Sequence, residues 1–172
     1  MLFQSTRGGG CKLDFEGAVL GGYAGDGGLY VPEYIPSVTL ETLRAWRELS
    51  FQDLAVEVLG LFVGTCIPKD DLQSIVVRSF AAYTHESVVP VVRAGSGLYV
   101  AELFHGPTLA FKDFGLQVTC QMLDFFAARS KRQITLVVST TGDTGPAAIH
   151  GACGSKSLRV VVTYPKGQIS VR

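Results

Sequence analysis

Apolar side chains recur at helical spacing in four short segments of the first ninety residues. Within each segment they lie three or four positions apart, which places one apolar stripe along the segment and predicts an amphipathic helix. The stripes consist of Phe15, Val19 and Leu20; Leu40, Leu43 and Trp46; Leu54, Val58, Leu61 and Phe62; and Leu72, Ile75, Val76 and Phe80. Pro68, followed by Lys69, Asp70 and Asp71, marks the start of the fourth helix, because acidic side chains favour the first turn.

From about residue 88 the pattern changes to strands that alternate with helices. Apolar runs predict strands at 88–92, 98–104, 134–139 and 158–164, and helical spacing predicts helices at 112–128 and 146–149. The continuous run at 134–139 is typical of a strand buried on both faces. From 98–104 onward the order is β-α-β-α-β, for which we expect a parallel sheet with right-handed crossovers. The fold class is therefore α/β, and ligands of such sheets bind beyond the carboxyl ends of the strands.

The run from His105 to Asp113 places one lysine, Lys112, where a glycine- and proline-containing loop meets a helix. The apolar residues Leu109 and Phe111 lie just before it. Apolar surroundings lower the pKa of an amine, which is what a lysine that attacks a carbonyl carbon needs. The alternative is a surface lysine whose side chain extends past its neighbours into solvent. The spacing alone leaves both interpretations open.

A second loop, residues 140–146, also leaves the carboxyl end of a strand, so the two loops are expected to form walls of one site. Asp143 or Thr144 can cap the following helix, with Pro146 in its first turn. Free amides at that helix start can also bind a carboxylate or phosphate. The triplet Asp143-Thr144-Gly145 occurs in aspartic proteases, but the helical pattern that follows disfavours that interpretation. The glycine spacing fits neither a dinucleotide fingerprint nor a Walker loop.

A glycine-dense segment at 21–32 joins the first two predicted helices. Its glycines either permit tight turns or present amides to a phosphate, and the spacing favours turns.

Composition narrows the classes of function. The chain has 172 residues, 47% of them hydrophobic and 17% charged, and a net charge of zero. We therefore expect one domain, or a domain with a small appendage, and no nucleic-acid partner, because no basic stripe is present. No apolar run suits a membrane span, and four dispersed cysteines fit neither a zinc site nor a disulfide framework. We expect a cytoplasmic protein without a metal.

Four motifs, in this order along the chain, resemble those of threonine synthase and its threonine synthase-like relatives. They are Ser5-Thr6-Arg7-Gly8, Asp26 to Pro32, Glu102 to Asp113, and Thr141 to Gly145. The segment Pro165-Lys166-Gly167 resembles a further loop of the same family. The resemblance implies a pyridoxal-phosphate enzyme of the tryptophan synthase β-like type. It also implies a helical N-terminal domain at 1–90, followed by the first part of the cofactor domain at 91–172.

The resemblance also implies roles for residues in the two loops. Lys112 matches the lysine that binds pyridoxal phosphate covalently and later moves protons, with Phe111 and Asp143 beside the cofactor. The loop that binds the substrate is matched by Thr141, Gly142, Asp143, Thr144 and Gly145. The family reaction removes phosphate from O-phosphohomoserine and adds water to give L-threonine. Some relatives only eliminate phosphate from phosphorylated hydroxy-amino acids, giving a ketoacid such as 2-oxobutanoate, and nothing in the sequence decides between these outcomes.

Full members of the family are considerably longer than this chain. In them, the glycine-rich loop for the cofactor phosphate and the residue that faces the pyridine nitrogen come after the position of Arg172. We therefore expect the N-terminal part of a threonine synthase-like enzyme, from a truncated or alternatively spliced sequence. Its buried strands would lack neighbours, leaving a sheet edge prone to self-association. A non-catalytic fragment that binds a partner through this edge is the other class of function.

Overall fold

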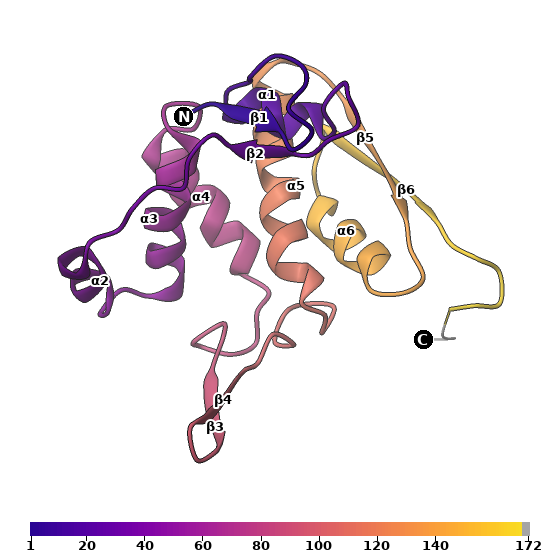
Figure 1. Ribbon diagram of the computed structural model, residues 1–172. Coiled ribbons are helices and arrows are strands. Elements are labelled where there is room, and N and C mark those ends of the chain that lie inside the picture. The colour runs from indigo at the N-terminus through magenta and orange to yellow at the C-terminus, as the bar shows by residue number, and fades with distance from the viewer. Residues whose placement is uncertain (170–172) are drawn as a thin grey trace. The chain divides into compact units, whose positions relative to one another are not determined.

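The computed structural model describes residues 1–169 and divides the chain into two compact units, the first ending at Val76 and the second beginning at Val77 (Figure 1). The prediction of a mixed α/β chain with a helix-rich N-terminal part is confirmed. None of the helices within residues 1–169 has the length and apolar character needed to cross a membrane.

The first unit contains the four helices that the apolar stripes predict. They are α1 (Phe15–Gly21), α2 (Leu40–Trp46), α3 (Phe51–Val63) and α4 (Lys69–Phe80), the last of which continues into the second unit. Asp14, Thr39 and Ser50 cap the first three helices, each accepting a hydrogen bond from an amide in the first turn. Apolar side chains of α3 and α4, Val56, Val63, Leu72 and Ile75 among them, are almost completely buried and form the core.

Two three-residue strands, β1 (Phe3–Ser5) and β2 (Tyr30–Pro32), pair in antiparallel register in the same unit and were not predicted. Between β2 and α1, the Asp26 carboxylate accepts hydrogen bonds from the hydroxyl of Ser5 (2.7 Å) and from the amides of Gly9 and Gly28 (both 2.9 Å). Within the glycine-dense segment, the amides of Gly22, Gly27 and Gly28 all donate to acceptors of the chain itself, which supports turns over phosphate binding as its role.

The second unit contains a hairpin followed by a strand–helix–strand arrangement. The hairpin consists of β3 (Val91–Gly95) and β4 (Leu98–Ala101), and α5 (Lys112–Arg129) follows it. β5 (Ile134–Ser139), α6 (Thr144–Ala152) and β6 (Leu158–Thr163) complete the unit. β5 and β6 pair in parallel along their whole length, from Ile134 opposite Leu158 to Ser139 opposite Thr163.

The prediction of a parallel β-α-β-α-β sheet is wrong for its first strand, the one expected at 98–104. β4 pairs only with β3 among the described strands, and in antiparallel register, because a tight turn through Gly97 (φ 72°) returns the chain directly onto β3. The strand predicted at 88–92 begins at Val91, and the one predicted at 98–104 ends at Ala101. Both strands of the hairpin are exposed along their whole length, so they do not belong to a buried sheet.

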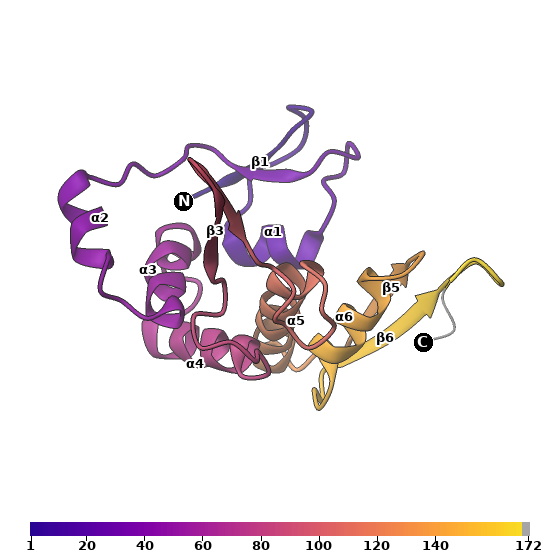
Figure 2. The same cartoon turned by 90° about the horizontal axis from the view of Figure 1, so that it is seen from below.

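The prediction that β5 is buried on both faces is also wrong. Its residues alternate between half-buried and exposed, and Val137 is 72% exposed. The reason is that α5 and α6 lie on the same side of the β5–β6 pair, as Figures 1 and 2 both show, so the opposite face carries no helix from the described chain.

Candidate functional site

Lys112 is the first residue of α5, as the sequence predicts, and its side chain is half-buried. Its amine nitrogen lies 4.3 Å from the centre of the Phe111 ring, close enough for a cation–π contact. Within residues 1–169 the amine forms no ion pair with a carboxylate. The preceding Leu109 and Phe111 side chains are 71% and 57% exposed, so they border the amine and do not enclose it. The Lys112 side chain therefore lies at the surface of this unit without a carboxylate partner among residues 1–169.

The loop before Lys112 is held in place by hydrogen bonds to the buried side chain of Asp113. The Asp113 carboxylate is fully buried and accepts hydrogen bonds from the amide and the hydroxyl of Thr108, both at 2.9 Å. Gly106 lies so close that a Cβ there would stand 2.5 Å from a carboxylate oxygen of Asp113. The backbone turns between them with Leu109 at a φ of 60°, a left-handed conformation. The carboxylate thus fixes the loop that presents Lys112.

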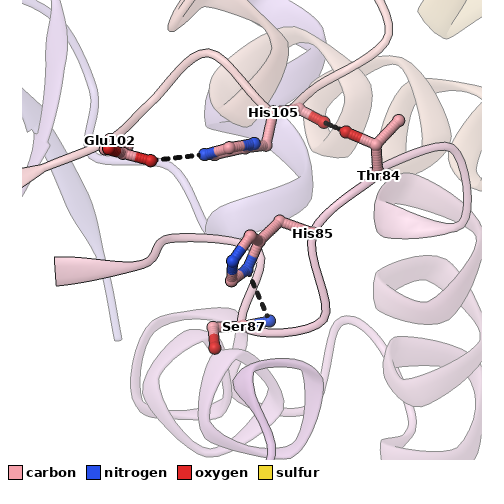
Figure 3. A network of polar contacts seen from close by, with 5 residues as sticks. All are labelled: Thr84, His85, Ser87, Glu102 and His105. Carbon is pink, nitrogen blue, oxygen red and sulfur yellow. Dashed lines mark hydrogen bonds and ion pairs between the residues drawn. The ribbon is translucent and has the colours of Figure 1, made fainter. Parts of the chain in front are cut away.

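A second set of contacts holds the start of the same loop (Figure 3). The imidazole of His105 forms a 2.7 Å hydrogen bond with the Glu102 carboxylate. The backbone carbonyl of His105 accepts a hydrogen bond from the Thr84 amide at 3.0 Å. The ring of His85 lies beside that of His105, with centroids 4.9 Å apart, and accepts a hydrogen bond from the Ser87 amide. Sequence reasoning missed Thr84 and His85, because nothing in the pattern of 81–90 signals a contact about twenty positions downstream.

Tyr83 is a further residue that sequence reasoning missed. Its ring packs against Phe80 and Phe114, and its hydroxyl is buried without a hydrogen-bond partner among the described residues. Burial, and then the nearby Asp113 carboxylate, raise the pKa of Tyr83 far above its ordinary value. The group therefore stays a neutral phenol under the loop that carries Lys112.

The second predicted loop is less tightly held. Asp143 occupies the N-cap position of α6, but its side chain makes no capping hydrogen bond, and Thr144 is already the first helical residue. The expectation that either residue caps this helix is therefore wrong, because the backbone of Asp143 is itself helical, whereas a capping residue has an extended backbone. The hydroxyl of Thr140 instead accepts from the amide of Gly142 at 3.0 Å.

Close packing fixes where this loop meets the strands. A Cβ at Gly145 would lie 2.8 Å from the Thr140 methyl group and 3.0 Å from a methyl group of Val162. Only glycine therefore lets α6 start directly against β5 and β6.

Lys112 and Thr144 share one open pocket of about 440 Å³, which we call the lysine pocket. It is lined by Phe111, Lys112, Phe114, Gly115, Leu116, Thr119 and Thr144. The other predicted substrate residues lie elsewhere. Thr141 lines a pocket of about 530 Å³ at the ends of β5 and β6, and Gly142 and Gly145 line a third of about 240 Å³. Asp143 lines none of these three pockets.

A pocket of about 280 Å³ between α3 and α4 of the first unit provides a useful contrast. It also contains a lysine, Lys69, but that amine pairs with the Glu57 carboxylate at 2.8 Å, which raises the pKa of Lys69. The amine of Lys112, by contrast, has no carboxylate partner within residues 1–169. No group of three or more metal-ligating side chains forms a metal site within residues 1–169.

Comparison with known proteins gives one consistent result. Residues 2–80 match the family described as threonine synthase N terminus. The chain is 45% identical over 171 residues to threonine synthase-like 2 of Mus musculus, an alignment that covers 99% of this chain and 35% of that protein. It is 40% identical over 177 residues to threonine synthase of Schizosaccharomyces pombe, covering 98% of this chain and 34% of that protein.

A crystal structure of PLP-bound threonine synthase from Brucella melitensis superposes with a TM-score of 0.95 at 40% identity. The superposition covers 99% of this chain and 37% of that one. This likeness confirms the fold class expected from the sequence. The chain spans about a third of the length of the relatives that it matches.

Proposed function

We propose that this chain, which belongs to the threonine synthase and threonine synthase-like family and spans the N-terminal portion of its members, carries the lysine that binds pyridoxal phosphate. The observation behind this proposal is the amine of Lys112, which is unpaired within residues 1–169 and lines the lysine pocket together with Thr144. A solved relative at 40% identity has PLP bound, which supports the assignment.

The residues of the pocket fit such a cofactor. A primary amine without a carboxylate partner can bond to an aldehyde carbon, and the exposed ring of Phe111 offers an aromatic face beside it. When bound, the cofactor acts as an electron sink that makes elimination from an amino acid feasible. Lys112 then holds the cofactor and moves a proton at its nitrogen. Asp143, at the start of α6, is the other residue that we propose to contact the cofactor.

The second loop binds the substrate in this proposal. The residues concerned are Thr141, Gly142, Asp143, Thr144 and Gly145. The Asp143 side chain makes no capping hydrogen bond at the N-terminus of α6, and the first amides of this helix and the positive end of its dipole would attract a carboxylate or phosphate. Residues 1–90 form the N-terminal domain of the family and residues 91–172 the first part of its cofactor domain.

The reaction that we propose is elimination of phosphate from O-phosphohomoserine, followed by hydration to L-threonine. The second candidate is elimination of phosphate followed by hydrolysis of the remaining enamine, which gives 2-oxobutanoate and ammonium. Incubating the 172-residue chain with pyridoxal phosphate and O-phosphohomoserine distinguishes the two, because threonine forms in the first case and 2-oxobutanoate in the second. A chain that releases no phosphate is not itself an enzyme of either kind.

Cofactor attachment is tested directly by chemical trapping. The chain is incubated with pyridoxal phosphate, reduced with borohydride, digested and analysed by mass spectrometry. We expect the adduct on the peptide that contains Lys112, and its loss in Lys112→Ala. Lys69→Ala is the matched control, because Lys69 also lines a pocket but its amine is paired with Glu57. An adduct spread evenly over exposed lysines, or unchanged in Lys112→Ala, would contradict the proposal.

A further inference from the structure

A buried amide links the helix that carries Lys112 to the helix that follows the second loop. Gln117 lies on α5, is only 4% exposed, and makes three of the four hydrogen bonds that its amide group can form. Its nitrogen donates to a carboxylate oxygen of Asp113 and to the backbone carbonyl of Ala147, both at 3.2 Å. Its oxygen accepts from the Nδ1 atom of His150 at 3.0 Å. A reversed amide would set its oxygen against two acceptors, so the orientation is fixed.

The chain of contacts runs between two walls of the lysine pocket. At one end, Asp113 follows Lys112 and holds the preceding loop through Thr108. At the other end, Ala147 comes three positions after Thr144, in the first turn of α6. Further along the helices, α5 and α6 are held by close packing of small side chains around Cys120. Gln117 adds a polar contact between the two helices, joining Asp113 on α5 to the first turn of α6.

We propose that Gln117 is a positioning residue that couples the loop presenting Lys112 to the N-terminus of α6 and so keeps Lys112 and Thr144 on one pocket. This inference rests on the proposed function for its catalytic meaning, but the coupling itself is a property of the described chain. Fully satisfied buried networks specify one arrangement strongly, and breaking one member leaves its partners unpaired. Loss of the amide therefore loosens both loops at once.

The test replaces Gln117 by Met, which has a similar volume and no hydrogen-bonding amide. We expect Gln117→Met to fold cooperatively, because the apolar contacts between α5 and α6 remain. Hydrogen exchange should rise up to about tenfold at residues 106–113 and 140–147 together, the change expected for about one lost buried hydrogen bond. Trapping of pyridoxal phosphate on Lys112 should become several-fold slower. Unchanged exchange in either loop, or a rise spread evenly over α5, α6 and the sheet, would overturn the coupling.

A second pair of variants keeps the inference testable if Gln117→Met does not fold. His150→Leu removes one of the three hydrogen bonds and should loosen the same two loops to a smaller extent. His150→Asn keeps a donor at the position of Nδ1 and should restore wild-type exchange and trapping. Equal effects of the two variants would overturn the inference. If the wild-type chain forms no adduct at Lys112, the proposed function fails, while the exchange of the two loops still decides the coupling.

Discussion

At the scale of single residues, Asp26 is the clearest source of pH-dependent stability in the first unit. Its hydrogen bond from Ser5, and then those from backbone amides, hold the pKa of Asp26 below its ordinary value of 3.8. A carboxyl whose folded pKa lies below its unfolded pKa stabilises the fold above the unfolded value, and that contribution is lost as the pH falls through the folded value.

We therefore expect Asp26→Asn to lower the midpoint of thermal unfolding at neutral pH and to flatten the decline in stability below pH 3.8. Thermal unfolding followed by circular dichroism across this range measures both effects. Glu48→Gln, at an exposed acid between α2 and α3, is the control and should follow the wild-type curve. If the stability of Asp26→Asn declines below pH 3.8 as steeply as that of the wild-type chain, the Asp26 carboxylate contributes nothing to the pH dependence of stability.

A second prediction at this scale concerns Gly106, which lies in close contact with Asp113 in the loop that precedes Lys112. A Cβ there would lie 2.5 Å from a buried Asp113 oxygen and 2.9 Å from its Cβ, so the loop would have to move. Gly106→Ala should lower the free energy of unfolding by about 1–3 kcal/mol, the usual cost of overpacking. Gly115→Ala meets open space on α5 and should raise the free energy of unfolding by up to about 1 kcal/mol. Urea denaturation compares the two, and equal effects would contradict the close contact.

The sequence predicts individual site residues where a motif carries them. Lys112 stands out because it is the one lysine between the predicted strand at 98–104 and the end of the following helix. Gln117 could not be predicted, because its role depends on His150, 33 positions away in the chain. The same holds for Tyr83, whose hydroxyl is buried by rings of the next helix. A buried polar contact between distant segments leaves no periodic signal in either one.

At the scale of elements, the contact between α5 and α6 depends on small side chains. Ala147 and Ala148 are completely buried, and a Cβ at Gly151 would lie 3.0 Å from the Leu116 carbonyl oxygen and 3.1 Å from the Cys120 sulfur. Burial raises the pKa of Cys120 to about 11. This thiol therefore has almost no reactive thiolate near neutral pH while the helices remain packed.

We expect thiol reagents to label the exposed Cys11 and Cys153 quickly and Cys120 only as the second unit opens. Gly151→Ala should push α5 and α6 apart, lower the free energy of unfolding by about 1–3 kcal/mol and speed the labelling of Cys120. Mass spectrometry of timed samples measures this rate. Gly60→Ala, at an open position of α3, is the control and should leave it unchanged. Rapid labelling of Cys120 in the wild-type chain would contradict the packing.

Elements were predictable where periodicity is long enough to be distinctive. All four N-terminal helices and α5 follow from apolar side chains that recur every three or four positions. The three-residue strands β1 and β2 are too short to show alternation. The run at 134–139 does carry a partial signal, because Thr135 and Ser139 lie on the exposed face, but Val137 between them is apolar and hides the alternation. The partner of β4 could not be read from the order of elements, since a hairpin and a crossover both begin with the same apolar run.

At the scale of the whole molecule, the chain spans about a third of its relatives, and one face of the β5–β6 pair is open. Val137 is 72% exposed and Val161, on the neighbouring strand, is 49% exposed. The domain boundary expected at residue 90 stays a prediction. The two compact units of the structure divide earlier, within α4. What the sequence predicted at this scale was the family, since motifs spread along the chain identify a family even where single strands are misjudged.

Self-association through this open pair is the prediction that belongs to the molecule as a whole. Exposed β-branched residues beside unpaired strand edges favour pairing with another copy, so we propose that the 172-residue chain associates as its concentration rises. Sedimentation velocity over a concentration series measures this. Val137→Lys should shift the series toward the monomer, because a buried lysine in the interface would lack a partner charge. Leu40→Lys removes a 72% exposed apolar side chain from α2 and should leave association unchanged. A wild-type chain that stays monomeric throughout, or an equal response to both variants, would rule out the β5–β6 pair as the surface of contact.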